Sequence, residues 1–442
     1  MKTILNLISK NKKTFWMNAF VIFAILLAFI SNNRFIMMGS LVLFYVLIFA
    51  SKLPVSYSLV FFSLPLMGVF DNLGFKYFFN FAIIVLFIKL IFYIFTHRIK
   101  IKYPIILFGI LFLFLYDCLN AMINNLFSLS YLGNFNIWIT YLILFLTISI
   151  FSEISIKKIY YYFYTGFVFS VFLCGVSVLM KWGFHIPTAY RFVGMSRDPN
   201  YYSIFALSLI LAAPILFNSK RKWFFMVSVF AMGILSISKM YILMVFGCLG
   251  LYLLKYFYDL VFLQRKIRFE KVILGIGVGI AAIVFLSVSG LMGTILDKYI
   301  FRLGTTTLTT GRDYLQSTFM HKLFSETQTF LFGRSLDYNY VYMIQYSQSS
   351  AMVAHNTYID VLMTFGIFVG LFYVLFLIYI FSKYPKTSSF TYSKFVLIAF
   401  FIISIFSLSY LKIDSFIFIV LFILICVKKG GEWSNENLRN HA

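Results

Sequence analysis

The chain is divided into long apolar segments that alternate with short polar joints, and this alternation constrains its fold more than any single motif. A helix needs about 17 to 25 apolar residues to cross a bilayer, or slightly fewer when its flanks reach the interface. Fourteen segments come close to this length. They cover residues 15–31, 35–51, 54–70, 77–95, 104–123, 135–151, 159–180, 201–217, 223–238, 240–258, 272–291, 357–381, 395–410 and 413–427.

Composition supports the same interpretation. Hydrophobic residues make up 62% of the sequence and charged residues 12%, which is about half the charged fraction of a soluble protein. We therefore expect an all-α polytopic membrane protein with about 12 to 14 transmembrane helices. Residues 1–442 would form a single integral membrane domain. The first apolar segment has no small-residue cleavage motif after it, so we expect it to act as an uncleaved insertion signal.

The distribution of basic residues predicts the orientation of these helices. Lys and Arg total 37, and the net charge is +23. In a soluble protein this charge would indicate nucleic acid, but in a membrane protein the placement of the charges matters more, and no nucleic-acid partner is expected. Most of the basic joints share one side when the N-terminus is placed inside. Because positive joints face the cytoplasm, both termini are predicted to be cytoplasmic.

One polar stretch, residues 292–355, interrupts the pattern on the predicted outer side. Loops of this length are usually functional or disordered, and this one contains too many aromatic residues to be disordered. Leu315, Phe319 and Leu323 recur every four residues. We therefore expect a short amphipathic helix that begins near Arg312, with Thr310 as its N-cap, on the membrane surface or over a cavity.

The predicted outer side carries basic residues in two places that the orientation rule does not explain. Their concentration favours an anionic partner, although long loops are also translocated whatever their charge. Arginine suits a phosphate partner because its planar fork binds two oxygens at once. The joint 181–200 contains Lys181, Arg191 and Arg197, and the long loop contains Lys298, Arg302, Arg312, Lys322 and Arg334.

Part of the joint 181–200 has a structural explanation. Asp198 as N-cap and Pro199 at the first helical position are a common way to begin a helix, and this could also account for Asn200. Arg191 is not needed for capping and remains a candidate phosphate ligand. Lys239 lies in a tight external hairpin and could either extend to the lipid headgroups or contribute to a site.

His355 is the last residue but one before a long apolar segment, at the predicted outer mouth of the bundle. Asn356 could be only an N-cap, and Asp360, one turn later, could pair with an arginine or orient the site. A histidine that is neutral near pH 7 can accept a proton from a hydroxyl, which contributes about 10² to 10⁴ in rate. Lys89 and Asp117 are ionisable groups inside spans; we expect Lys89, in the inner half of its span, to extend to the interface. Asp117 lies in the outer half of its span and is a candidate for contact with a cavity.

Several chemistries lack their usual motifs. The sequence has no phosphate-binding Walker A motif, no paired carboxylates in a soluble loop and no Asp-x-Asp metal motif. Nucleotide-driven transport and metal-dependent transfer from nucleotide sugars are therefore unsupported. The four cysteines lie within apolar segments and form no Cys-x-x-Cys pair, so neither a metal site nor a disulfide framework is indicated.

The order of these motifs resembles the polysaccharide polymerase and O-antigen ligase superfamily, the Wzy and WaaL group. The resemblance spans roughly residues 191–370. It differs at two positions, since Lys239 stands where the family often has arginine and Tyr314 where a tryptophan often follows the loop arginine. It is carried by Arg191 with Gly194 and Pro199-Asn200, Ser238-Lys239, Gly311-Arg312, Leu331-Phe332-Gly333, and His355-Asn356 followed by Gly366 and Gly370.

The resemblance implies an inverting, metal-independent membrane glycosyltransferase with a GT-C-like fold and no cofactor. Its substrate would be an undecaprenyl-diphosphate-linked oligosaccharide at the outer face of a bacterial cytoplasmic membrane, with membrane lipid, a chain-length regulator and a flippase as possible partners. Arg191 and Arg312 would stabilise the leaving diphosphate, and His355 would activate or orient the acceptor hydroxyl. The expected substrate-binding residues are Arg197, Asn200, Lys239, Tyr314, Arg334, Asn356 and Asp360.

Three functions follow from this resemblance and pattern. The first is a polymerase that joins lipid-linked repeat units during capsule, exopolysaccharide or O-antigen synthesis. The second is a ligase that transfers finished glycan to another acceptor. The third, from another class, is a lipid-linked oligosaccharide flippase, which would place charges along a path across the bilayer rather than on one face.

Overall fold

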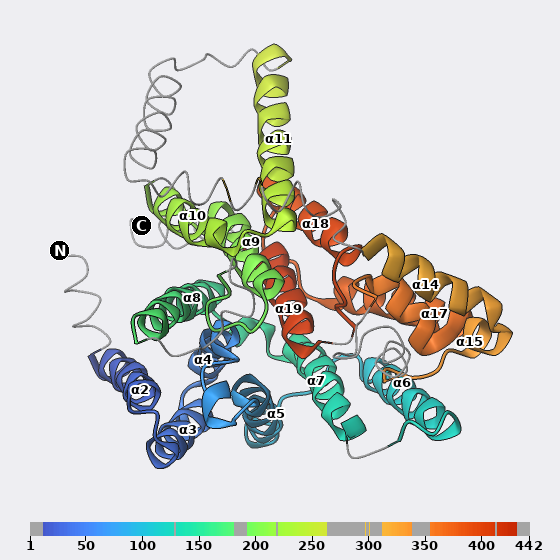
Figure 1. The fold of residues 1–442 in the computed structure, drawn as a ribbon, viewed down its shortest axis with the longest axis horizontal. Helices are drawn as coiled ribbons and strands as arrows, with labels where there is room; N and C mark the ends of the chain where they lie inside the picture. Colours follow the sequence, from blue (N-terminus) through green and yellow to red (C-terminus); the bar gives the residue numbers. More distant parts are fainter. Residues whose placement is uncertain are drawn as a thin grey trace.

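The computed structural model describes residues 12–127, 130–180, 192–217, 220–262, 297, 300, 312–337, 354–411 and 413–430. These residues form helices joined by turns, and no strand occurs among them (Figure 1). The all-α fold class predicted from the apolar segments is confirmed. An all-helical fold satisfies the backbone within each segment, as a lipid environment requires.

All the expected spans overlap a described helix except 272–291, which lies outside the described residues. Among the residues that the structure describes, six helices (α5, α6, α8, α9, α11 and α17) are long and apolar enough to cross a membrane. The helices are α2 (Lys12–Ser31), α3 (Arg34–Ala50), α4 (Leu53–Ser63), α5 (Phe78–Thr96), α6 (Pro104–Ile123), α7 (Phe135–Ser149), α8 (Ile156–Leu179), α9 (Pro199–Leu216), α10 (Lys220–Gly233), α11 (Lys239–Val261), α14 (Arg312–Ser325), α15 (Thr327–Phe332), α17 (Thr357–Lys383), α18 (Tyr392–Ile405) and α19 (Asp414–Lys429).

Aromatic side chains fill the centre of the bundle, where α4, α8 and α19 meet. The ring of Phe61 lies 4.6 Å from that of Phe418 and 5.7 Å from that of Phe422, and Phe163 lies 5.3 Å from Phe422. Aromatic pairs at such distances add to the free energy gained by burying their area. Helix α19 is therefore the central helix of the fold, and α2, α3 and α11 lie at the edges of the bundle (Figure 1).

The helices define two ends of the bundle. We call the end at which α9, α11, α17 and α19 begin the site end, and the opposite end the lysine end. At the lysine end, Lys89 donates to the carbonyls of Phe49 (2.7 Å) and Ser51 where α3 finishes, and Lys429 donates to that of Ser152 (3.1 Å). Cations commonly satisfy the last carbonyls of helices. Lys89 is therefore buried, with its ammonium group on the last carbonyls of α3 at this end of the bundle.

A helix, α14, begins at Arg312 where the sequence predicted one, while Thr310 lies outside the described residues. Phe319 and Leu323 are fully buried, and Phe324 is 63% exposed. The buried side chains form a second hydrophobic cluster with the start of α17 that is separate from the main core. Helices α14 and α15 thus form a layer on α17 (Figure 1).

Helix α17 is interrupted at Gly366, where the backbone has φ 69°. Gly333, just after α15, has φ 72°. A Cβ atom on Gly366 would lie 2.3 Å from the carbonyl oxygen of Leu331, and one on Gly333 would lie 2.4 Å from the carbonyl carbon of Thr364. Both positions therefore require glycine for conformation and for space. Two motif segments from distant parts of the sequence cross at this point.

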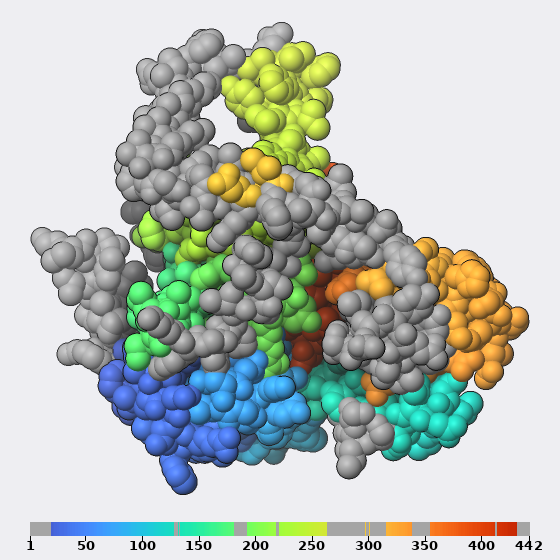
Figure 2. Space-filling model, viewed as in Figure 1, coloured from blue at the N-terminus to red at the C-terminus, as the bar shows by residue number. Residues whose placement is uncertain are grey.

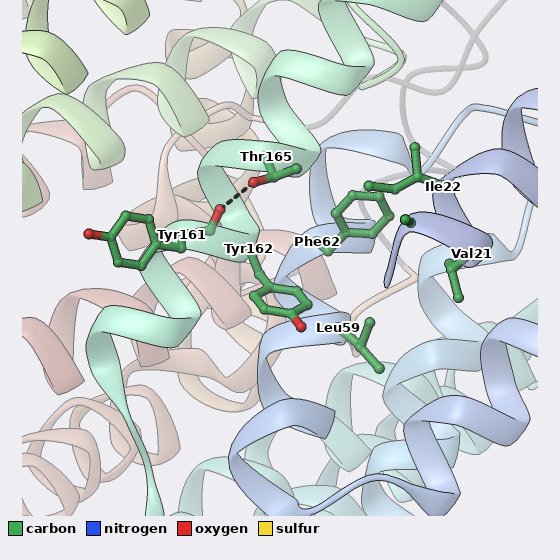
Figure 3. A pocket seen from close by; sticks show the side chains of 8 residues that line it. Val21, Ile22, Leu59, Phe62, Tyr161, Tyr162 and Thr165 are labelled. Atoms are coloured by element: carbon green, nitrogen blue, oxygen red, sulfur yellow. Dashed lines mark hydrogen bonds between the residues drawn. The ribbon is translucent and has the colours of Figure 1, made fainter. Parts of the chain in front are cut away.

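An apolar cavity of about 280 Å³ lies between α2, α4 and α8 (Figure 3). The hydroxyl of Thr165 donates to the Tyr161 carbonyl within α8 at 2.8 Å. None of the predicted site residues contributes to this cavity. It is lined by Ala19, Val21, Ile22, Leu59, Phe62, Tyr161, Tyr162 and Thr165.

Candidate functional site

The segment that follows Arg191 is bonded to two neighbouring turns at the site end. Arg191 itself lies outside the described residues. The amide of Phe192 donates to the carbonyl of Leu235, in the turn between α10 and α11, at 3.2 Å. The amide of Gly68, in the turn between α4 and α5, donates to the carbonyl of Met195 at 2.8 Å. The chain immediately after the candidate phosphate ligand is therefore held from both sides.

Arg197 forms a bidentate ion pair with Asp71. Its Nε donates to Oδ2 at 2.8 Å and its Nη2 to Oδ1 at 2.7 Å, and Nη2 also donates to the carbonyl of Lys76. Arg197 has φ 66°, a conformation that L residues adopt only when other contacts hold them. The predicted substrate-binding arginine thus has a structural partner, Asp71, that no local sequence pattern indicates.

The start of α9 is capped by Asp198, as the sequence predicted. Asp198 accepts a hydrogen bond from the Asn200 amide at 2.6 Å, and Pro199 occupies the first helical position. This pairing satisfies one of the backbone amides that every helix start leaves without an internal partner. Asn200 is half-buried in the first turn, and its role in binding substrate stays a prediction.

A short turn joins α10 to α11 as predicted, but the two helices diverge from it and do not pack along each other (Figure 1). Ser203 Oγ donates to Ser236 Oγ at 3.1 Å, which ties this turn to α9. Ser238 is the N-cap of α11 and accepts from the Tyr241 amide at 3.4 Å. Lys239 begins the helix and is only 7% exposed. Its side chain therefore lies within the protein and does not extend freely to lipid headgroups.

His355 lies just before α17 in a local structure built by its neighbours. Asn356 is the N-cap and accepts from the amides of Tyr358 (3.0 Å) and Ile359 (3.3 Å). His355 itself has φ 50° and is half-buried, and Asp360 is fully buried one turn further on. The side chain of Asn356 is thus used for capping, which was the alternative to a role in binding.

A turn between α18 and α19 connects the starts of α11 and α17. The Thr357 hydroxyl donates to the carbonyl of Leu408 at 2.6 Å and accepts from the amide of Tyr410 at 3.0 Å. The Ser407 hydroxyl contacts the sulfur of Met240 at 3.2 Å. No functional residue was predicted in this turn, yet it joins the His355 and Lys239 segments.

The same turn also reaches α9 and α7 through the start of α19. The ring of Tyr201 lies 4.7 Å from that of Phe416 in an edge-on arrangement. Asp414 accepts hydrogen bonds from the side-chain amides of Asn80 (2.5 Å) and Asn136 (2.7 Å). The only sequence signal for this network was an acidic residue, Asp414, at the start of the apolar segment 413–427.

The loop arginines differ in what the structure describes. Arg312 and Tyr314 lie in the first turn of α14, and the positions of their side chains lie outside the described part of the chain. Arg334 pairs with Glu326 at 2.9 Å and donates to Thr329 at 2.7 Å and to Asn124 at 3.2 Å. Arg334 therefore holds α15 to α6.

Glu326 is the acidic partner in this group. Partial burial raises the pKa of its carboxyl, but hydrogen bonds from Lys322 and Thr329 and the nearby charge of Arg334 outweigh the burial. The pKa of Glu326 therefore lies below its ordinary value. Its carboxylate stabilises the layer formed by α14 and α15.

Together these contacts bring the Phe192, Lys239 and His355 segments to one end of the bundle. In the space-filling view, red surface of the C-terminal helices is visible between the green surface of α9 and the orange segment formed by α14 and α17 (Figure 2). Among the residues that the structure describes, no group of three or more His, Cys, Asp or Glu side chains could hold a metal ion.

The fold is that of a helical membrane protein with a polar end assembled from distant segments. No family model matches the chain, and no curated protein matches it.

Proposed function

We propose that this protein is a polysaccharide polymerase of the cytoplasmic membrane. It would join undecaprenyl-diphosphate-linked oligosaccharide repeat units at the outer face. The observation that carries the proposal is the meeting of three segments at the site end: the start of α9, the turn before α11 and the His355 end of α17. Each segment supplies a cationic or proton-accepting residue that transfer from a lipid diphosphate would use.

The proposed reaction is an inverting displacement at the anomeric carbon of the donor sugar. The acceptor hydroxyl oxygen forms the new bond to this carbon as the bond from carbon to phosphate oxygen breaks. The lipid diphosphate leaves with the electron pair, and the hydroxyl proton passes to the imidazole of His355. Arg191 and Arg312 would stabilise the charge on the leaving diphosphate, without a metal ion.

The contacts of Arg197 favour a structural role for this residue over direct binding of the diphosphate. Its guanidinium is held by both oxygens of Asp71, and an arginine paired in this way has much of its charge neutralised. We therefore assign Arg197 to holding the joint that presents Arg191, and leave the diphosphate to Arg191, Arg312 and Lys239.

The distribution of buried charge favours a transferase over a flippase. Lys89 and Lys429 cap helices at the lysine end, whereas Asp117 bonds to loop residues near the site end. A flippase would need charged groups along a path that crosses the bilayer. The buried charges described at the two ends have structural partners and do not outline such a path.

Replacement of His355 tests the proposal directly. We expect His355→Ala to lower the rate of polymerisation of a purified lipid-linked repeat unit by about 10² to 10⁴, because the proton acceptor is lost. The assay contains a chelator throughout, and the wild-type protein should remain active in it. His97→Ala is the control, since His97 is an exposed histidine at the lysine end.

Two results would contradict the proposal. One is unchanged polymerisation by His355→Ala, and the other is loss of wild-type activity on chelation. Deletion of the gene separates polymerase from ligase. Products with a single repeat indicate a polymerase, whereas full-length chains that stay bound to lipid indicate a ligase.

A further inference from the structure

The loop that follows α15 enters the bundle beside α6. We call residues Phe332 to Leu336 the strap. The carbonyl of Phe332 accepts from the Tyr116 hydroxyl at 2.7 Å and from the Asn120 side-chain amide at 3.0 Å. The amide of Leu336 donates to Asp117 Oδ1 at 2.9 Å. The strap is therefore bonded to three residues in the last two turns of α6.

On its other side the strap is bonded to α17 at the helix interruption. The amide of Arg334 donates to the carbonyl of Met363 at 2.8 Å, and that of Ser335 donates to Thr364 at 3.2 Å. Both carbonyls lie just before Gly366, where α17 leaves helical geometry. Irregular backbone within a membrane protein is tolerated where other protein groups form hydrogen bonds with it. The strap amides form these hydrogen bonds with the two carbonyls.

Asp117 is the side chain that fixes the strap. It is fully buried. Its Oδ2 accepts from the Tyr131 hydroxyl at 2.6 Å and from the Trp138 indole at 3.3 Å, while its Oδ1 bonds to the strap. A buried carboxyl is costly unless hydrogen bonds compensate it, so this arrangement links Asp117 tightly to its donors.

We infer that Asp117 is a positioning residue for His355 and acts through the strap and the first half of α17, residues 357–365. His355 precedes one end of this half-helix, and the strap is bonded to the other end. Displacement by about 1 Å can lower catalytic rate about a hundredfold, and a half-helix of little more than two turns transmits a shift from end to end. The inference rests on the proposed function, because His355 is the residue that is positioned.

The first experiment tests the strap without using activity. Ser335 is fully buried, so a Ser335→Cys variant, with the four native cysteines replaced by alanine, should react slowly with a soluble maleimide. We expect Asp117→Asn to increase its labelling rate at least fivefold, because the amide group turns a donor toward Tyr131 or the strap. Unchanged labelling would show that Asp117 does not hold the strap and would overturn the inference.

Two controls accompany the labelling. Asp259→Asn removes a carboxylate from α11, where it pairs with Lys255 at 3.0 Å, and should leave Ser335→Cys slow. A cysteine at Gln328, an exposed position on α15, should react quickly in every background. An effect of Asp259→Asn equal to that of Asp117→Asn would mean general loosening, which also overturns the inference.

The second experiment is a double-mutant cycle on polymerisation of the purified lipid-linked repeat unit. Asp117→Asn should lower kcat about tenfold to a hundredfold and change KM less than about twofold. In a His355→Ala background it should cause no further loss, because its effect passes through His355. Losses that multiply would show that Asp117 acts independently of His355.

If the Asp117→Asn protein does not accumulate, a milder variant tests the same contact. Tyr131→Phe removes a single hydrogen bond to Asp117 and should produce a smaller loss in the same direction, again absent in His355→Ala. The two possible failures are distinguishable. Wild-type protein without transfer activity contradicts the proposed function, and the inference falls with it. Normal transfer by a variant with a released strap contradicts the inference alone.

Discussion

At the scale of single residues, the Asp71 and Arg197 pair shows how a charged motif can serve the protein's own architecture. The side chains are 16% and 31% exposed, so the pair is partly screened by solvent. Its two parallel hydrogen bonds fix the guanidinium plane, and the strained backbone at Arg197 needs such a contact. The pair therefore stabilises the turn from which α9 begins.

We predict that Asp71 and Arg197 are energetically coupled. Asp71→Ala and Arg197→Ala should each lower stability, and the double variant should be less unstable than the sum of the two. The coupling free energy should be about 0.5 to 3 kcal/mol, as for residues in direct contact. Thermal unfolding in detergent measures it. The Lys255 and Asp259 pair, spaced four residues apart in α11, is the control, with an expected coupling of about 0.3 to 0.5 kcal/mol.

Activity measurements separate this role from substrate binding. If Arg197 contacted the diphosphate, Arg197→Ala would abolish transfer whether or not Asp71 was also replaced. If it only holds the joint, the double variant should retain more activity than Arg197→Ala at the same temperature. The first result would restore Arg197 as a substrate ligand.

At the scale of elements, the layer formed by α14 and α15 is attached to the bundle by two kinds of contact. Phe319 and Leu323 bury an apolar face against the start of α17. Glu326, at the junction of the two helices, forms ion pairs with Lys322 and Arg334 and accepts a hydrogen bond from Thr329. The apolar contact is independent of pH, whereas the ionic contact depends on the charge of one carboxylate.

The stability of this layer should therefore depend on pH. Because the folded pKa of Glu326 is lowered, its contribution is present above the unfolded pKa and is lost as pH falls through the folded value. Glu326→Gln should destabilise the layer by about 1 kcal/mol at pH 7 and have progressively less effect in acid. Hydrogen exchange of α14 and α15 measures this difference.

Glu153→Gln is the matched control, since Glu153 is exposed near the lysine end. It should leave exchange in α14 and α15 unchanged at every pH. A Glu326→Gln effect that persisted undiminished in acid would contradict an ionic role for this carboxylate.

The elements themselves could be predicted from the sequence to a large extent, because each depends on local information. Apolar runs marked the helices, and Asp198 and Asn356 were recognisable as N-caps of α9 and α17. The partners of the site residues could not be predicted in the same way. Asp71 precedes Arg197 by 126 positions, and Asp117 precedes Leu336 by 219. Such contacts depend on how helices pack, which no local pattern records.

At the scale of the whole molecule, the two ends differ in the use of charge. The lysine end places ammonium groups on carbonyls where helices finish, and the site end contains ion pairs and capped helix starts. Basic residues accumulate on the cytoplasmic side of membrane proteins. The lysine end should therefore face the cytoplasm and the site end the exterior.

Two exposed lysines allow this orientation to be tested. Lys76 lies between α4 and α5 at the site end, and Lys386 lies between α17 and α18 at the lysine end. A cysteine at position 76 should react with an impermeant maleimide in intact cells. A cysteine at position 386 should react only after permeabilisation. The opposite pattern would reverse the topology and remove the basis for an external site.

The crossing of α15 and α17 limits which substitutions this chain can accept during evolution. The segments that contain Gly333 and Gly366 can approach this closely only because neither residue carries a Cβ atom. A side chain at either position would push the two segments apart, so the requirement for space at both positions comes from the same crossing. The two positions thus form one inherited unit, and related sequences should either keep both glycines or have lost both.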